Sequence, residues 1–264
     1  MTFAPLAILL SLLICAAAPA WSESGQERMG QERMGQEPAG MARCPGAGDW
    51  SPVDWHLPAT KTRLMAHRPL TIVALGAAST VGKAAGGSAF AYPARLEARL
   101  KIELGALFPD ASVMVVNAGV PGDSTADMLA RLGHGLLDRD PSLVIWEVGT
   151  LEAVHGSSLE GFDETLGAGI VLLKRRHVDL VLMDMQYAPG AAGIIDYDPY
   201  IDIIRRHAET GGVALFERYD IMRWWTEAGL LDLTARREPR PALPRRVYDC
   251  LANILADGIE RAVR

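Results

Sequence analysis

From Leu70 onward, short apolar runs alternate with longer segments of helical length. The apolar runs cover residues 71–75, 112–116, 143–148, 179–183 and 213–216, and the helix-length segments cover residues 89–107, 124–137, 159–176, 200–210 and 245–263. Strands that are apolar along most of their length are typical of a parallel sheet with helices on both faces. The pattern therefore predicts an α/β fold in three layers, with a doubly wound (flavodoxin-like) sheet of about five parallel strands.

Three glycine-containing segments follow the first three predicted strands. They are Gly76-Ala77-Ala78-Ser79-Thr80, Asn117-Ala118-Gly119 and Gly149-Thr150-Leu151-Glu152. In doubly wound sheets, ligands bind in the crevice outside the carboxyl ends of the strands. We therefore expect a ligand crevice formed by Gly76, Ala77, Ala78, Ser79, Asn117, Gly119, Gly149, Thr150 and Leu151.

These segments resemble the signature blocks of the SGNH (GDSL-type) serine hydrolases. That family has Gly-Asp-Ser-x-Thr after the first strand, a glycine in the second block and Gly-x-Asn-Asp after the third strand. The resemblance covers about residues 67–264 and extends to residues 184–189 and 248–252. It implies an SGNH-hydrolase-like fold. It also implies ester hydrolysis by a serine nucleophile. In the family a histidine activates this serine, an aspartate orients the histidine, and backbone and asparagine N–H groups stabilise the oxyanion.

The residues that perform this chemistry are replaced here. Aligned on the family's blocks, the nucleophile falls on Ala78, the aspartate before it on Ala77, and the oxyanion asparagine on Leu151. Gly119 keeps the family's glycine and one backbone donor. The Asp-x-x-His pair before the last helix falls on Pro239 and Ala242, and no histidine follows His207. The resemblance therefore indicates a degenerate member with no intact catalytic residue.

Three nearby groups of residues are alternative sources of a catalytic side chain. Ser79 lies one residue beyond the nucleophile position, and we expect its side chain to point away from Gly119, as a helix cap. Asp123 and Ser124 belong to a Gly-Asp-Ser sequence, but it follows the second strand rather than the first. We therefore expect one of them to cap the next helix. His155 lies four residues beyond Leu151 and has no evident serine partner, so it is expected at the surface.

The remaining clusters predict neither a metal nor a cofactor. Aspartates at 179, 184, 196, 198 and 202 are spread over strand ends and a turn, with no histidine or cysteine at ligand spacing. Trp224 and Trp225 are expected in the core, although they resemble a helix beside the family's cleft. A basic segment interrupted by prolines stands where the family has its catalytic loop. We expect it to be solvated, and binding of an anionic glycan is the alternative. Its basic residues are Arg236, Arg237, Arg240, Arg245 and Arg246.

The N-terminal region predicts export. Residues 1–20 contain no charge, residues 6–18 are apolar or small, and Ala18-Pro19-Ala20 offers a signal peptidase site. An uncleaved anchor is the alternative, although the run is short for a membrane span. A GQERM repeat occupies residues 25–37, and we expect residues 21–66 to form a flexible tether before a domain at 67–264. The expected location is periplasmic or secreted.

Two cysteines, Cys44 and Cys250, would remain after removal of residues 1–20. An even number in an exported chain suggests a disulfide, with two free buried thiols as the alternative. The bond would tie the start of the mature chain to its last helix.

The formal net charge of −6 argues against sequence-independent binding of nucleic acid, and contact with the membrane is expected only during export. The function expected from these observations is that of a pseudoenzyme, which binds an acylated or acetylated saccharide, or a partner protein, in the retained crevice. An active carboxylic-ester or acetyl hydrolase that uses a displaced residue such as Ser79 is the second hypothesis. A purely structural interaction module is the third.

Overall fold

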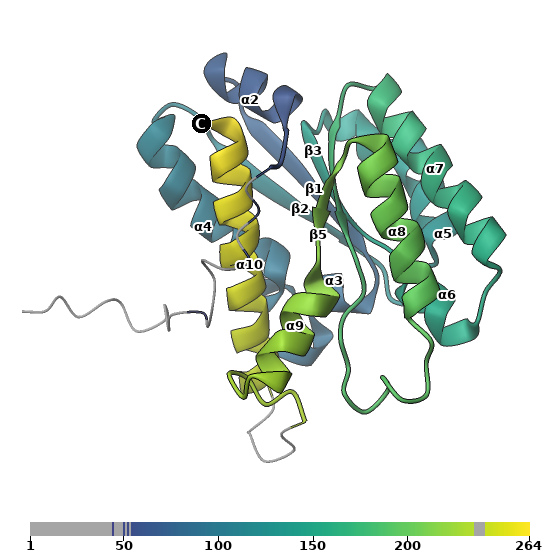
Figure 1. Ribbon diagram of the computed structural model, residues 1–264. Coiled ribbons are helices and arrows are strands. Elements are labelled where there is room, and N and C mark those ends of the chain that lie inside the picture. The colour runs from purple at the N-terminus through teal and green to yellow at the C-terminus, as the bar shows by residue number, and fades with distance from the viewer. Residues whose placement is uncertain (1–43, 45–49, 51, 53, 235–240) are drawn as a thin grey trace, which may run out of the picture. The chain divides into compact units, whose positions relative to one another are not determined.

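The computed structural model describes residues 44, 50, 52, 54–234 and 241–264. Its centre is one sheet of five parallel strands in the order β2-β1-β3-β4-β5 (Figure 1). The strands are β1 (Leu70–Gly76), β2 (Val113–Gly119), β3 (Leu143–Glu147), β4 (Asp179–Met183) and β5 (Ala214–Phe216). The predicted doubly wound sheet is confirmed, and each predicted strand agrees with an observed one to within three residues at either end.

Position in the sheet explains the hydrophobic pattern of each strand. β1 pairs with both β2 and β3, and all seven of its residues are buried. β2 lies at an edge, and its residues alternate between the core and the surface, with Met114 half exposed. The fully apolar run and the alternating run thus correspond to a central strand and an edge strand.

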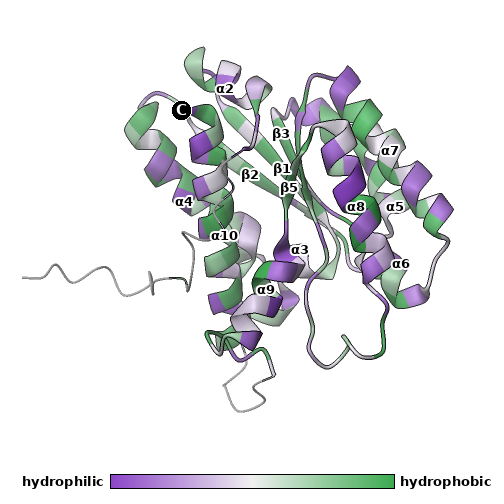
Figure 2. Ribbon diagram, viewed as in Figure 1, coloured by the Kyte–Doolittle hydropathy of each residue, from purple (hydrophilic) through white to green (hydrophobic). Residues whose placement is uncertain are grey.

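Helices cover both faces of the sheet (Figure 1). The helices are α2 (Pro58–Met65), α3 (Ala78–Val81), α4 (Tyr92–Leu107), α5 (Thr125–Arg131), α6 (Thr150–His155), α7 (Leu159–Arg175), α8 (Asp198–Gly211), α9 (Arg218–Glu227) and α10 (Ala242–Val263). One core joins α2, α4, α9 and α10 to the sheet, and a second core on the opposite face joins α5, α7 and α8 to it. The ribbon is accordingly apolar toward the sheet and polar outward (Figure 2).

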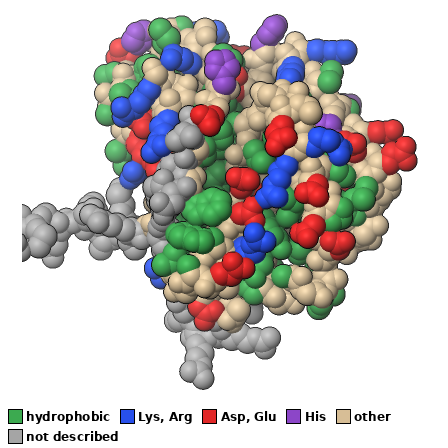
Figure 3. Space-filling view, viewed as in Figure 1, with side chains coloured by type: hydrophobic (Ala, Val, Ile, Leu, Met, Phe, Trp, Pro, Cys, Tyr) green, Lys and Arg blue, Asp and Glu red, His purple; other side chains and the backbone are tan. Residues whose placement is uncertain are grey.

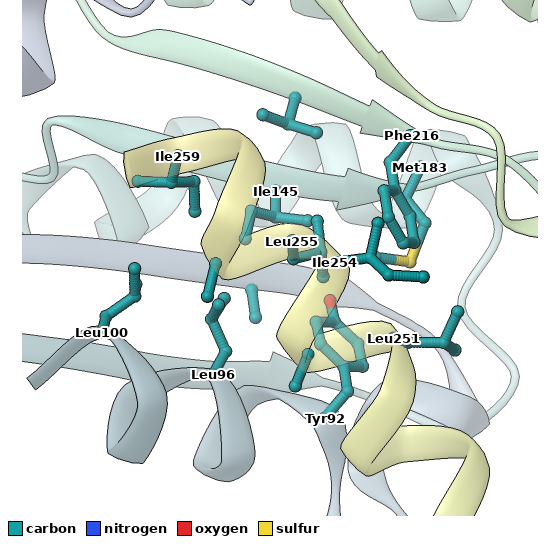
Figure 4. Close-up of a cluster of buried hydrophobic side chains, with 14 of the residues drawn as sticks. Tyr92, Leu96, Leu100, Ile145, Met183, Phe216, Leu251, Ile254, Leu255 and Ile259 are labelled. Carbon is teal, nitrogen blue, oxygen red and sulfur yellow. The ribbon is translucent and has the colours of Figure 1, made fainter. Parts of the chain in front are cut away.

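The longest helix, α10, lies at the centre of the first core. Leu251, Ile254, Leu255 and Ile259 point from it toward the sheet and toward α4 (Figure 4). Burying an aliphatic side chain of this size contributes roughly 1.5–3 kcal/mol relative to leaving it exposed. The C-terminal segment that carries the family's catalytic loop in other members is therefore anchored here by an apolar helix.

Two helix predictions need correction. The segment 124–137 is not one helix, because His134 and Gly135 leave helical backbone angles after α5 ends. The last helix begins at Ala242 rather than Arg245, so the position aligned with the catalytic histidine is the first helical residue. Within the described residues, no helix is long and apolar enough to cross a membrane.

The compact unit extends further toward the N-terminus than residue 67. It spans residues 43–264, and α2, inside the segment predicted as tether, packs against α10, β1 and β4. Asp179 caps α2, because its carboxylate accepts hydrogen bonds from the backbone N–H groups of Ala59 and Thr60. The repeat at 25–37 and the predicted signal segment lie outside the described residues.

A disulfide joins Cys44 to Cys250, which confirms the predicted pairing. The two Cα atoms lie 5.1 Å apart, and the bond spans 206 residues of sequence. Further along the same segment, the Trp55 indole N–H donates to the carbonyl of Leu215 in edge strand β5 at 3.1 Å. Cys44 is therefore fixed to α10, and Trp55 to the edge of the sheet.

Candidate functional site

The loop after β1 turns directly into α3, with Ala77 at the N-cap and Ala78 as the first helical residue. Gly76 is required for this turn, because a Cβ atom there would lie 2.2 Å from Thr80 Oγ1 and 3.0 Å from Glu147 Cβ. Ala78 is exposed at the family's nucleophile position. The position predicted for the nucleophile therefore carries a methyl group at the surface of this turn.

The second block lies directly beside this turn. Gly76 and Gly119 are partners in the register of β1 and β2, and a Cβ atom on Gly119 would lie 2.8 Å from the backbone nitrogen of Val81. The N–H of Gly119 donates to Asn117 Oδ1 at 3.1 Å, and Asn117 Nδ2 donates to the carbonyl of Thr80 at 2.7 Å. The backbone donor that the sequence retains is thus already bonded within the chain.

The third block starts α6, with Gly149 at its N-cap. Leu151 is half-buried and offers no hydrogen-bond donor from its side chain. Glu152 is buried, and its Oε1 accepts from the backbone N–H of Thr125 at 2.6 Å, at the start of α5. This block therefore joins two helices, and Leu151 supplies no side-chain donor for an oxyanion.

The positions predicted for the family's Asp-x-x-His pair are Pro239 and Ala242. Pro239 lies outside the described residues, and Ala242 is exposed at the start of α10. All six histidines of the chain fall within the described ranges. His155 is exposed at the end of α6, as predicted, and His207 Nε2 is paired with Asp163 Oδ1. Among the described residues, no histidine is hydrogen-bonded to a serine hydroxyl.

Sequence reasoning missed a buried ion pair behind Ala78. Glu147, the last residue of β3, is 2% exposed, and Arg218, the first residue of α9, is 1% exposed. Arg218 Nη2 donates to Glu147 Oε1 at 3.0 Å, and Ser79 Oγ donates to the same oxygen. Thr80 Oγ1 donates to Oε2 at 2.7 Å. Glu147 therefore joins the first block to β3 and α9.

The charge state of Glu147 follows from these contacts. Burial disfavours its charged form. The charge of Arg218 outweighs this effect, together with hydrogen bonds from Arg218, Ser79 and Thr80, and lowers the pKa of Glu147. A carboxylate held in its ionised form is a weak base. The Ser79–Glu147 hydrogen bond therefore orients the serine but does little to activate it.

Two further titratable groups lie close to the pair. Asp184, which directly follows β4, is 1% exposed, and its Oδ1 accepts from the backbone N–H of Tyr219 at 2.8 Å. Burial raises the pKa of Asp184 to about 7. Burial, with a smaller contribution from Glu147, raises the pKa of Tyr248 on α10 to about 12.

A pocket of about 710 Å³ opens beside α3. Its walls come from α3 and the segment after it, the loop after β4, α9, Leu233 and the start of α10. It is lined by Ala78, Ser79, Lys83, Ala84, Gln186, Tyr187, Ala188, Pro189, Gly190, Ala191, Met222, Leu233, Leu243, Pro244, Val247 and Tyr248. Of the predicted crevice residues, Ala78 and Ser79 line it. Gly119 and Leu151 do not, so the pocket lies on the α9 and α10 side of Ala78.

The other candidate residues from the sequence cap helices, form ion pairs or pack against aromatic rings. Ser124 caps α5, with its hydroxyl accepting from the backbone N–H of Asp127, and Asp123 forms an ion pair with Arg131. Trp225 is fully buried, and Trp224 stacks at an angle on Trp50 with ring centroids 6.1 Å apart. No group of acidic, histidine or cysteine side chains in the described ranges could hold a metal ion. Arg236, Arg237 and Arg240 lie outside those ranges.

One signal in the sequence could have revealed the ion pair. Glu147 is the only charged residue within the apolar run 143–148, and a strand buried on both faces tolerates a carboxylate only beside a partner. Arg218 stands two residues after the run 213–216, at the same end of the sheet. Because both residues stand at carboxyl ends of parallel strands, their proximity could be expected.

The profile of the non-GDSL lipase-like family matches residues 43–264. The chain belongs to this family. Part of the chain is also similar to an arylesterase from Vibrio mimicus, with 31% identity over 115 residues, which are 41% of this chain and 57% of that protein. The family assignment thus agrees with the SGNH-like motifs of the sequence.

Solved esterases share the fold of this non-GDSL lipase-like protein. AlinE4, an SGNH-hydrolase family esterase, matches with a TM-score of 0.50 and 26% identity, over 65% of this chain and 86% of that chain. A two-domain esterase active on acetylated mannans matches with a TM-score of 0.58 and 19% identity, over 78% of this chain and 54% of that chain. The second likeness, at 19% identity, concerns the fold alone.

Proposed function

We propose that this non-GDSL lipase-like protein binds an acylated or acetylated saccharide in the pocket beside Ala78 and does not cleave it. The observation that carries the proposal is the methyl group of Ala78 at the nucleophile position, beside a serine whose hydroxyl is bonded to Glu147. Loss of the serine or the histidine alone costs a serine hydrolase about 10⁶ in turnover. Here both are replaced, and Leu151 removes an oxyanion donor as well.

The ligand class is supported by the fold neighbours and by the pocket. One solved structure of this fold is an esterase active on acetylated mannans. The pocket beside Ala78 falls within the usual 300–1,000 Å³ of ligand sites, with mostly apolar walls and a few polar groups. Retention of a pocket next to a lost nucleophile is expected of a protein that recognises an acyl group but leaves its ester intact.

Isothermal titration with acetylated xylo- and manno-oligosaccharides tests this proposal. We expect saturable binding, and the recovered ligand should keep all its acetyl groups when it is examined by NMR. Matched oligosaccharides without acetyl groups should bind more weakly. Release of acetate would contradict the proposal. Absence of binding to any acylated ligand would also contradict it and would favour a docking role toward a partner protein.

A second candidate function is ester hydrolysis through Ser79. The side chain lines the pocket and touches a carboxylate, so a serine–carboxylate pair exists in the site. The pair lacks a competent base, because Arg218 keeps Glu147 ionised, and Gly119 N–H already bonds to Asn117. Labelling with a serine-reactive phosphonate should therefore fail. Labelling that Ser79→Ala abolishes would establish this second function.

We also propose that the protein is exported, with cleavage after Ala20. The apolar run before Ala18-Pro19-Ala20 supports export, and so does the disulfide, since such bonds persist in oxidising compartments. N-terminal sequencing of periplasmic or secreted material should begin at Trp21. An intact Met1 in a membrane fraction would contradict the proposal.

A further inference from the structure

The pocket beside Ala78 has an unusual charge balance for this chain. The protein carries a formal charge of −6, yet Lys83 is the single charged residue among the described residues that line the pocket. Lys83 is exposed at the start of a short 3-10 turn, and no carboxylate pairs with it among the described residues. The ammonium group is therefore open to a ligand.

A second cation is held against the same turn. Arg245 Nε donates to the carbonyl of Ala85 at 2.8 Å, and its guanidinium lies over the ring of Phe90, 3.5 Å from the centroid. No acidic partner of Arg245 is found in the described part of the chain. The potential at this side of the pocket is thus positive, and it favours an anion.

Tyr248 supplies a neutral donor deeper in the same pocket. The residue is 4% exposed and lines the pocket. Its pKa, raised to about 12 by burial and then by Glu147, keeps the hydroxyl protonated at neutral pH. A protonated phenol donates a hydrogen bond to an oxygen acceptor. Tyr248 is therefore suited to hydrogen-bond a ligand oxygen.

Much of the remaining wall is apolar. Met222, Leu243 and Val247 line the pocket from α9 and α10, and the loop after β4 adds Gln186 and Tyr187 together with small residues. Behind Tyr248, the charge of Glu147 is balanced by Arg218 at 3.0 Å, so the buried pair adds little repulsion toward an anion. The described lining thus combines a mostly apolar wall, several neutral polar side chains that include Tyr248, and the cation of Lys83.

We infer that the pocket selects an anionic amphiphile, a ligand with an aliphatic chain and a carboxylate, through Lys83 and Tyr248. This inference rests on the proposed function, because it requires that the site binds an acyl-type ligand without cleaving it. The ammonium of Lys83 attracts the carboxylate, and the Tyr248 hydroxyl donates to one of its oxygens. The carboxylate can belong to a free fatty acid or to an acidic sugar that carries an alkyl chain.

Isothermal titration of residues 43–264 with four probes tests the inference. Octanoate and octyl glucuronide carry the carboxylate on a free acid and on a sugar, whereas methyl octanoate and octyl glucoside are their neutral counterparts. We expect each anionic probe to bind about tenfold more tightly than its neutral counterpart. Binding by octanoate alone identifies a free acid as the source, and binding by octyl glucuronide alone identifies an acidic glycolipid. Equal affinity for charged and neutral probes, or no binding by either anion, would overturn the inference.

Variants assign the selectivity to residues. Lys83→Gln should remove most of the tenfold preference, whereas Lys61→Gln on α2, outside the pocket, should leave it unchanged. Tyr248→Phe keeps the ring in place and should weaken both anionic probes about fivefold to tenfold. Circular dichroism and urea unfolding check that each variant is folded. An unchanged preference in folded Lys83→Gln would contradict the assignment.

The same titrations separate this inference from the proposed function. Turnover of p-nitrophenyl octanoate, measured in parallel, would show that the proposed function is wrong, while the preference for an anion could still be read from octanoate affinity. Absence of turnover together with equal affinity for the charged and neutral probes would retain the proposed function and reject the charge selectivity.

Discussion

The hydroxyl of Ser79 donates to Oε1 of Glu147, the same oxygen that Arg218 Nη2 contacts at 3.0 Å. A serine one residue beyond the nucleophile position is thus part of a buried ion-pair network rather than an attacking group. The network ties α3, β3 and α9 together under the pocket, and it gives Ser79 and Thr80 roles in orienting Glu147. The first block of this family member therefore has a structural role, because Ser79 and Thr80 both donate to the Glu147 carboxylate.

The buried pair should be sensitive to the loss of one partner. Arg218→Met leaves the Glu147 carboxylate buried and uncompensated, which we expect to destabilise the domain by about 3–5 kcal/mol in urea unfolding. Glu147→Gln with Arg218→Met removes both charges and should cost less than Arg218→Met alone.

Arg223 provides the matched control on the same helix. Its side chain is 47% exposed and pairs with Asp220 at 3.0 Å, so Arg223→Met should change stability by no more than about 1 kcal/mol. Equal losses for Arg218→Met and Arg223→Met would show that the Glu147–Arg218 pair does not hold the site together.

Asp184 should make stability depend on pH in a defined window. Its pKa is raised from 3.8 to about 7 by burial, so between about pH 4 and pH 7 the folded chain binds a proton that the unfolded chain has released. The contribution of Asp184 to stability therefore falls as the pH rises through this window, by on the order of 4 kcal/mol in total. Asp184→Asn should flatten the profile and stabilise the protein at pH 8.

Urea unfolding at pH 5 and pH 8 checks this prediction, with the exposed Asp202→Asn as the control that keeps the wild-type profile. Glu147 acts in the opposite sense, because a lowered pKa contributes stability that is lost as the pH falls through the acidic range. A wild-type slope retained in Asp184→Asn would contradict the assignment of that carboxyl.

The Cys44–Cys250 bond should contribute to stability through the long loop that it closes. Reduction, or Cys44→Ser with Cys250→Ser, should cost about 2–5 kcal/mol, because the unfolded chain gains conformational freedom. Non-reducing peptide mapping should find the two peptides linked. Two freely alkylated thiols in the native protein would contradict the bond.

Much of the fold could be predicted from periodicity, because strands buried on both faces have distinctive apolar runs. Asp179–Met183 was predicted to the residue. The short helices α2, α3 and α6 were missed, since fewer than nine residues carry little periodic signal. The break at His134 and Gly135 also left the apolar pattern unchanged, so a single helix was expected there.

The site was predictable only in part. The lost groups could be placed from the motifs, because Ala78 and Leu151 align with the family's blocks. The Glu147–Arg218 pair could not be placed by motif, since its partners lie 71 residues apart and meet only through the strand order. The side of Ala78 on which the pocket opens depends on α9 and α10 packing, which no local pattern specifies.

Restoring the catalytic groups should be strongly non-additive. Ala78→Ser alone should give almost no esterase activity, because an unassisted hydroxyl is a poor nucleophile. Activity should become measurable only when Leu151→Asn, Pro239→Asp and Ala242→His are added, since triad members act as a unit. Ala242 is the first residue of α10 and exposed, so grafting the family's whole loop provides a second route if the point changes stay silent. Substantial activity from Ala78→Ser alone would contradict this account.

The most direct test of the central claim is the steady-state turnover of p-nitrophenyl acetate by the purified, unmodified domain. The account predicts a rate no higher than that of buffer with a matched inert protein, and the same rate for Ser79→Ala. Saturable turnover that Ser79→Ala abolishes would contradict it and would show that this non-GDSL lipase-like protein is a working esterase.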